Sequence, residues 1–88
     1  MLPIHTVSGD LTLNTVSKQL TDGIEAIKQG CVEFDLSQVD KLDSAALAFI
    51  LVCQRTALGF NRQLRCLHLP ENLKNLATLY GVAPYITV

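Results

Sequence analysis

The stretch VEFDLSQVDKLDSAALA, residues 32–48, decides the fold. At its start, apolar and polar residues alternate, which is the pattern of a strand with one buried face. The apolar positions are Val32, Phe34 and Leu36. We therefore predict a central strand over residues 31–36.

A loop and a helix are predicted after this strand. Residues 37–42 predict a loop at the carboxyl end of the strand, where open α/β sheets form their sites. Either Asp43 or Ser44 can cap the following helix by accepting a backbone N–H. The apolar run after them predicts a helix over residues 45–58, before Gly59.

The N-terminal part of the chain predicts two strands and a helix. Residues 4–7 and 11–13 are short β-prone runs joined by the turn-forming residues 8–10, which favours a hairpin. A helix then extends to Gly30, because apolar residues recur on one of its faces. These residues are Val16, Leu20, Ile24 and Ile27.

The C-terminal part completes an α/β pattern. Residues 63–69 predict a strand, which a right-handed crossover makes parallel to the central one. Pro70 and Glu71 suit the first turn of a helix, and residues 85–88 form a candidate closing strand. The apolar face of this last helix carries Leu73, Leu76, Ala77 and Tyr80, before Gly81. The prediction is a single α/β domain over residues 1–88, with a mixed sheet and the order β-β-α-β-α-β-α.

Composition excludes several classes of function. The 88 residues include seven Lys and Arg and eight Asp and Glu, with no basic cluster for nucleic acid or anionic lipid. The longest apolar run, residues 45–53, is far shorter than the about 20 residues of a membrane-spanning helix. No signal peptide is visible, so we expect a cytoplasmic protein.

Catalytic and metal-binding patterns are absent from the sequence. His5 and His68 lack metal-ligand spacing, the glycines form no phosphate-binding loop, and no nucleophile motif surrounds Ser44. The cysteines, at positions 31, 53 and 66, predict reduced core residues. We expect no catalytic residue, no metal and no cofactor.

The helix over residues 45–58 has two distinct faces. The residues predicted to face the sheet are Ala46, Ile50, Cys53 and Ala57, and those predicted to face outward are Ser44, Ala48, Leu51, Arg55 and part of Val52. A neighbouring helix could cover the outer face. Alternatively, an apolar stripe beside one Arg and one hydroxyl has the composition of a protein-binding surface.

Residues 32–48 resemble the strand, loop and helix start of STAS domains, with the pattern D-L-S-x-V-x-x-[IVL]-D-[ST] followed by small residues and Leu. Residues 73–83 resemble the phospholipid-transport branch, the MlaB-type subunit of the bacterial Mla ABC system. The resemblance implies a non-catalytic subunit that binds an MlaF-like ABC ATPase at the inner membrane. The outer face of the helix over residues 45–58 and the residues before it are the predicted contact surface, with partner-binding residues at Asp43, Ser44, Ala48, Leu51 and Arg55.

The other branch that the resemblance suggests comprises the anti-sigma factor antagonists, whose motif reads D-S-S-G-L-G. In that motif a kinase phosphorylates the second serine, and this chain has Ala45 at that position. Ala46 and Ala48 replace the glycines of the motif, whereas Ser44 keeps its first serine. The resemblance therefore favours the transporter subunit over the partner-switching regulator.

Overall fold

Three parallel strands form the centre of the structure, a computed structural model that describes residues 4–86. The strands lie in the order β1-β2-β3 and alternate with helices along the chain, which confirms the predicted α/β class. The strands are β1 (Ile4–Leu11), β2 (Glu33–Leu42) and β3 (Arg65–Leu67). The helices are α1 (Val16–Lys28), α2 (Ala45–Gly59), α3 (Glu71–Leu79) and α4 (Ala83–Ile86).

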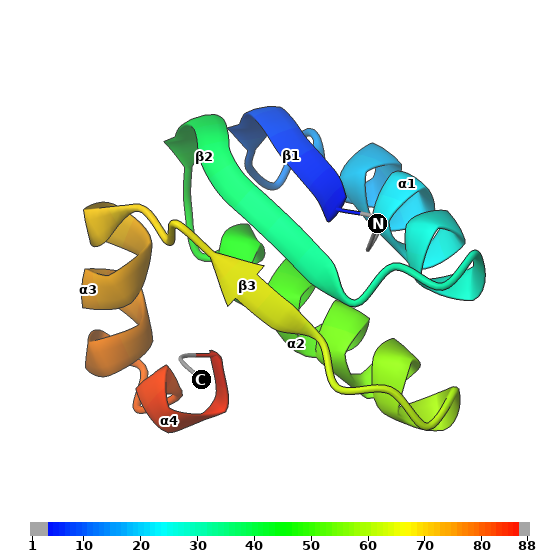
Figure 1. Cartoon of the computed structure of the whole chain (residues 1–88). Helices are drawn as coiled ribbons and strands as arrows, with labels where there is room; N and C mark the ends of the chain where they lie inside the picture. The colour runs from blue at the N-terminus through cyan, green and yellow to red at the C-terminus, as the bar shows by residue number, and fades with distance from the viewer. Residues whose placement is uncertain (1–3, 87–88) are drawn as a thin grey trace.

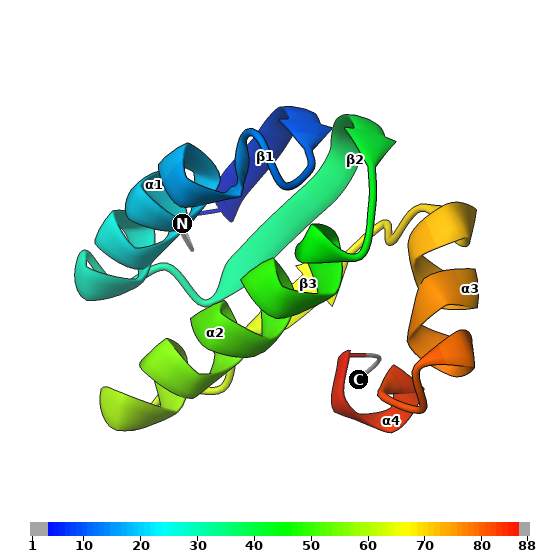
Figure 2. The same ribbon diagram turned by 180° about the vertical axis from the view of Figure 1, so that it is seen from behind.

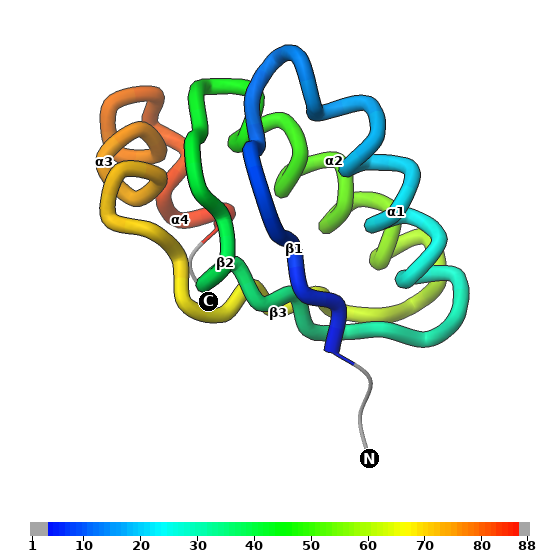
Figure 3. The backbone as a smooth tube through the Cα atoms, turned by 90° about the horizontal axis from the view of Figure 1, so that it is seen from above, coloured from blue at the N-terminus to red at the C-terminus, as the bar shows by residue number. Residues whose placement is uncertain are grey.

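The sheet carries its two crossover helices on one face. Both crossovers step in the same direction along the sheet, and right-handed connections of this kind place their helices on the same side. Figure 2 shows α1 and α2 side by side in front of the strands, and Figure 3 shows the same layer from above. Figure 1 looks onto the opposite face, which no helix within residues 4–86 covers. The shorter helices α3 and α4 stand beside β3 and contact α2.

The core lies between the sheet and the helices. Its side chains come from β1, β2 and all four helices, and each large one contributes on the order of 1.5–3 kcal/mol by leaving water. The largest buried side chains are Phe34, Phe49, Leu11, Ile27, Leu36, Ile50, Leu73 and Ile86. Cys31 and Cys53 are buried in the core, as predicted, Cys66 is half-buried, and no disulfide joins them within residues 4–86.

The ends of the three longer helices follow one scheme. Gly30, Asn61 and Gly81 all have a positive φ, the left-handed conformation that ends a helix. The amide after each of them donates to a carbonyl five residues earlier; Cys31 N, for example, donates to Ala26 O at 3.0 Å. The helix ends predicted at Gly30, Gly59 and Gly81 therefore agree with the structure to within two residues.

The predicted N-terminal hairpin is wrong, because residues 4–11 form the single strand β1. Both halves of β1 pair with β2 in parallel, and the register shifts on either side of Ser8 and Gly9. Gly9 has φ +82°, so the expected turn residues bend the strand without reversing it. Gln19 of α1 donates its side-chain amide to Ser8 O at 2.8 Å and thus satisfies a carbonyl in the irregular part. The described sheet is consequently parallel and not mixed.

Two other predicted elements differ from the structure. Residues 37–42, predicted as a loop, extend β2 because they pair with the second half of β1. Of the candidate strand 85–88, Tyr85 and Ile86 belong to α4, where Ile86 is buried in the core. The last two positions of that candidate strand lie outside the described residues.

The predicted strand at residues 63–69 is shorter in the structure, where β3 covers only Arg65–Leu67. Of the apolar face predicted for α3, Leu73 and Ala77 are buried and Leu76 is half-buried. Tyr80 is exposed, because α3 ends at Leu79 and the chain turns toward Gly81.

Candidate partner-binding surface

Helix α2 has the two faces that its sequence predicts. Ala46, Ile50, Cys53 and Ala57 are fully buried in the core. Helix α1 packs beside α2, close enough that a Cβ built on Gly23 would lie 3.3 Å from Cys53 Sγ. The small residues on both helices therefore allow α1 and α2 to pack closely. The side of α2 opposite the sheet is exposed to solvent.

The outer stripe of α2 consists of Ser44, Ala48, Leu51, Val52 and Arg55. Ser44, Ala48, Val52 and Arg55 are exposed, so within residues 4–86 no neighbouring helix covers them. Leu51 is half-buried and packs partly against the core. The structure thus brings four of the five predicted site residues together on one face, and the fifth, Asp43, precedes them.

Asp43 joins the end of β1 to the start of α2. One carboxylate oxygen, Oδ1, accepts the backbone N–H of Ala45 at 2.8 Å, and Oδ2 accepts that of Leu13 at 3.1 Å. Its own N–H donates to Leu11 O at 3.3 Å. Both carboxylate oxygens are therefore engaged within the domain, so Asp43 positions the start of α2.

Ser44 occupies the N-cap position but its side chain makes no capping hydrogen bond. Its backbone is already helical, with φ −62° and ψ −18°, and Asp43 accepts the Ala45 N–H in its place. Of the two candidate caps, the carboxylate of Asp43 therefore serves this role. The exposed hydroxyl of Ser44 remains available to a partner.

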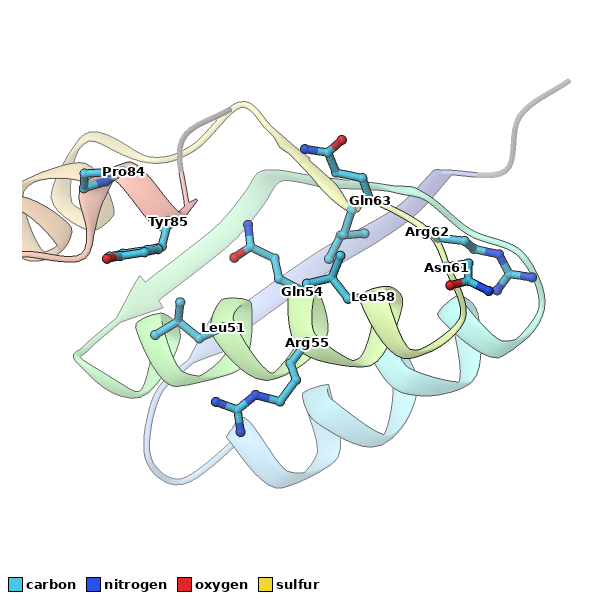
Figure 4. A pocket seen from close by; sticks show the side chains of 10 residues that line it. Leu51, Gln54, Arg55, Leu58, Asn61, Arg62, Gln63, Pro84 and Tyr85 are labelled. Carbon is cyan, nitrogen blue, oxygen red and sulfur yellow. The ribbon is translucent and has the colours of Figure 1, made fainter.

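A groove with a volume of about 720 Å³ continues from the outer stripe toward α4. It shares Leu51 and Arg55 with the stripe, and Figure 4 shows Leu51, Gln54 and Leu58 along one side of α2. Pro84 and Tyr85 of α4 form the other end. Sequence reasoning missed this groove because it assigned residues 85–88 to a strand. A proline at 84 suits a first helical turn and was the available signal for α4.

The groove carries positive charge. Arg55 and Arg62 line it, and none of its lining residues is acidic. The ion pairs in residues 4–86 are Lys18–Asp22 and Glu33–Arg65, so neither arginine is paired with a carboxylate of that region. Arg62 is held in place, because its Nη1 donates to Ile27 O at 2.6 Å and its guanidinium lies 5.4 Å from the centroid of the Phe60 ring.

The thiols in the domain have the character of core residues. Burial raises the pKa of Cys53 to about 12 and that of Cys66 to about 11, so both stay protonated at neutral pH. A protonated thiol is a poor nucleophile and a poor metal ligand. Across residues 4–86, no group of three or more His, Cys, Asp and Glu side chains is placed to hold a metal ion. No helix in the same part of the chain is long and apolar enough to span a membrane.

Comparison with known proteins identifies the family. The family model described as "Mlab, STAS domain" matches residues 5–87. The chain belongs to this MlaB-type STAS family. A search of curated proteins gives no significant match.

Two solved structures show that the STAS fold extends over this domain. One is a candidate anti-sigma factor antagonist from Thermotoga maritima, with a TM-score of 0.75 and 14% identity, covering 96% of this chain and 74% of that one. The other is the anti-sigma factor antagonist SpoIIAA in its unphosphorylated form, with a TM-score of 0.63 and 15% identity, covering 86% and 72%. At these identities the likeness concerns the fold alone, and it confirms the predicted STAS architecture.

Proposed function

We propose that this STAS domain is a non-catalytic accessory subunit that binds the ATPase of a phospholipid-transporting ABC complex and supports its assembly and activity. The partner is an MlaF-like ATPase. The domain would lie in the cytoplasm and reach the inner membrane through this partner. Its contact surface is the outer stripe, with Asp43 fixing the position of the helix that carries it.

The observation that carries this proposal is the exposed outer stripe of α2 in a chain of the MlaB-type family. Ala48 and Val52 place apolar surface in water, with Ser44 and Arg55 at its edges. A dry centre with a polar rim is the composition of a protein interface. The core does not use this surface, so a partner is the simplest reason for its apolar character.

A partner-switching regulator of the anti-sigma factor antagonist type is the alternative. The exposed Ser44 hydroxyl at the start of α2 favours it, because a helix N-terminus accommodates a phosphate. Ala45 counts against it, since the position that the resemblance assigns to the phosphorylated serine has no hydroxyl. The state of Ser44 in cells therefore separates the two functions.

Affinity purification of the tagged protein from its own cells tests the proposal. We expect an ABC ATPase to co-purify with the unaltered protein and to be lost with Ala48→Asp, which places a charge at the centre of the exposed stripe. The matched control is Asn72→Asp, which adds the same charge at an exposed position of α3. Recovery of an anti-sigma factor without any ATPase would refute the transporter function.

A further inference from the structure

We propose that the groove between α2 and α4 is a second part of the partner surface, which seats an acidic, apolar segment of the ATPase. This inference rests on the proposed function and specifies the chemistry of the partner. It concerns residues beyond the outer stripe, namely Leu58 near the end of α2, Arg62 in the segment after α2, and Tyr85 on α4.

The shape of the groove suits a polypeptide segment better than a small ligand. Small-molecule pockets bury most of their ligand, which requires enclosing walls. Here the apolar walls are open to water, since Leu58 is 66% exposed and Tyr85 is 67% exposed. Exposed aliphatic and aromatic side chains on opposite sides of a groove form a surface on which apolar side chains of a partner can pack.

The charge of the groove determines the character of that segment. Arg55 and Arg62 contribute two guanidinium groups, and no carboxylate among the lining residues neutralises them. Figure 4 shows the two guanidinium groups apart from each other, so a segment that brings a carboxylate to either of them would gain charge-assisted hydrogen bonds. Because Arg62 is already held by Ile27 O and Phe60, its guanidinium loses little freedom on binding. A basic segment would be repelled.

The groove is continuous with the outer stripe. Leu51 and Arg55 belong to both, so a partner docked on Ala48 and Val52 reaches the groove without a gap. Figure 4 shows the path along α2 from Leu51 to Leu58. One partner can therefore occupy both surfaces, with apolar contacts on the stripe and an acidic contact in the groove.

Matched pairs of variants test the groove in binding measurements with the co-purified ATPase. Leu58→Gln should weaken the association at least tenfold, whereas Leu79→Gln should change it less than twofold. Both leucines are exposed in the last turn of a helix, so both variants should fold. In the second pair, Tyr85→Ala should weaken the association at least tenfold and Tyr80→Ala should change it less than twofold. Arg55→Glu should weaken binding at least tenfold, and Lys74→Glu on α3 is its charge control.

A photo-crosslinking amino acid identifies the occupant. Placed at position 58 or 85 in cells, it should crosslink to a segment of the ATPase that contains Asp or Glu beside apolar residues. Crosslinks to a basic segment, to lipid or to a second copy of this chain would overturn the inference. Crosslinks at position 48 without any at 58 or 85, or equal binding by Leu58→Gln and Leu79→Gln, would overturn it and leave the proposed function intact. If position 48 also gives no ATPase, both proposals fail.

Discussion

At the scale of single residues, Asp43 stabilises the start of α2 directly before Ser44, which we propose as a contact residue. Its carboxylate accepts two backbone N–H groups from distant parts of the chain, that of Leu13 in the turn after β1 and that of Ala45 in α2. Removing it leaves two donors without their partner, each at a net contribution of about 0.5–1.5 kcal/mol. We expect Asp43→Ala to lower the free energy of unfolding by about 1–3 kcal/mol, as urea denaturation would measure.

Ser44 provides the control for this prediction. Its side chain makes no capping bond, so Ser44→Ala should change the free energy of unfolding by less than about 0.5 kcal/mol. If Ser44→Ala proved as destabilising as Asp43→Ala, the assignment of the cap to Asp43 would be wrong. The sequence left both residues as candidate caps because each type accepts backbone N–H groups. The hydrogen bond from Ala45 N–H to Asp43, together with the helical dihedral angles of Ser44, decides between them.

His5 makes the stability of the domain depend on pH. Its ring packs edge-on against Phe34, with centroids 4.9 Å apart, and its Nε2 is buried without a hydrogen-bond partner in the described structure. Burial lowers the pKa of His5 below 6.5, and the Asp22 carboxylate opposes this only in part. As the pH falls below about 6.5, the unfolded chain takes up the proton first and the folded state loses stability.

The variant His5→Phe isolates this effect. It keeps an aromatic ring against Phe34 and removes the titrating group. Between pH 7.5 and 5, the free energy of unfolding should fall more steeply for the unaltered protein than for His5→Phe. Parallel curves for the two proteins would show that His5 binds its proton equally well in both states.

At the scale of elements, Gly23 shows how packing overrides helix propensity. It lies in the middle of α1, where alanine would favour the helix by up to about 1 kcal/mol. A Cβ there would lie 3.2 Å from the Phe34 ring and 3.3 Å from Cys53 Sγ, and both of these side chains are fully buried. We expect Gly23→Ala to destabilise the domain by about 1 kcal/mol or more, because the core cannot move aside freely.

Gly59 is the matched control for this substitution. It is the last residue of α2, and a Cβ there would meet no atom within 4 Å. Gly59→Ala should therefore raise the free energy of unfolding, by up to about 1 kcal/mol. Thermal or urea unfolding of the two variants side by side gives the comparison. Stabilisation by Gly23→Ala of the same size would contradict the close packing of α1, α2 and β2.

Elements with strong periodicity could be predicted from the sequence, and those that depend on distant partners could not. The apolar residues of α1 and the buried face of α2 follow from their spacing alone. Residues 8–10 have turn chemistry, yet they stay in β1 because β2 pairs with both of its halves. Residues 85–86 have strand propensity, yet they form part of α4 because Ile86 fits the core as the end of a short helix.

At the scale of the whole molecule, one part of the candidate site could be predicted from the sequence and the other part could not. The outer stripe lies on one helix, so its residues could be named from helical spacing. The groove combines α2, the segment after it and α4, so it required the tertiary structure. The two surfaces share Leu51 and Arg55. Helical spacing therefore predicts these two residues of the groove but not the groove itself.

The state of Ser44 in cells decides between the two functions that we propose for the whole molecule. A phosphate there would add nearly two negative charges at the edge of the apolar stripe beside Ala48. The start of α2 could accommodate it locally, but a partner docked over the stripe would have to bury that charge. We therefore expect intact-mass measurement of the protein from its own cells to show Ser44 unmodified while the ATPase co-purifies. A substantial fraction heavier by one phosphate, which disappears in Ser44→Ala, would favour the partner-switching regulator. Ser44→Thr keeps a hydroxyl that can make the contact or carry the phosphate, so it should preserve binding in either case.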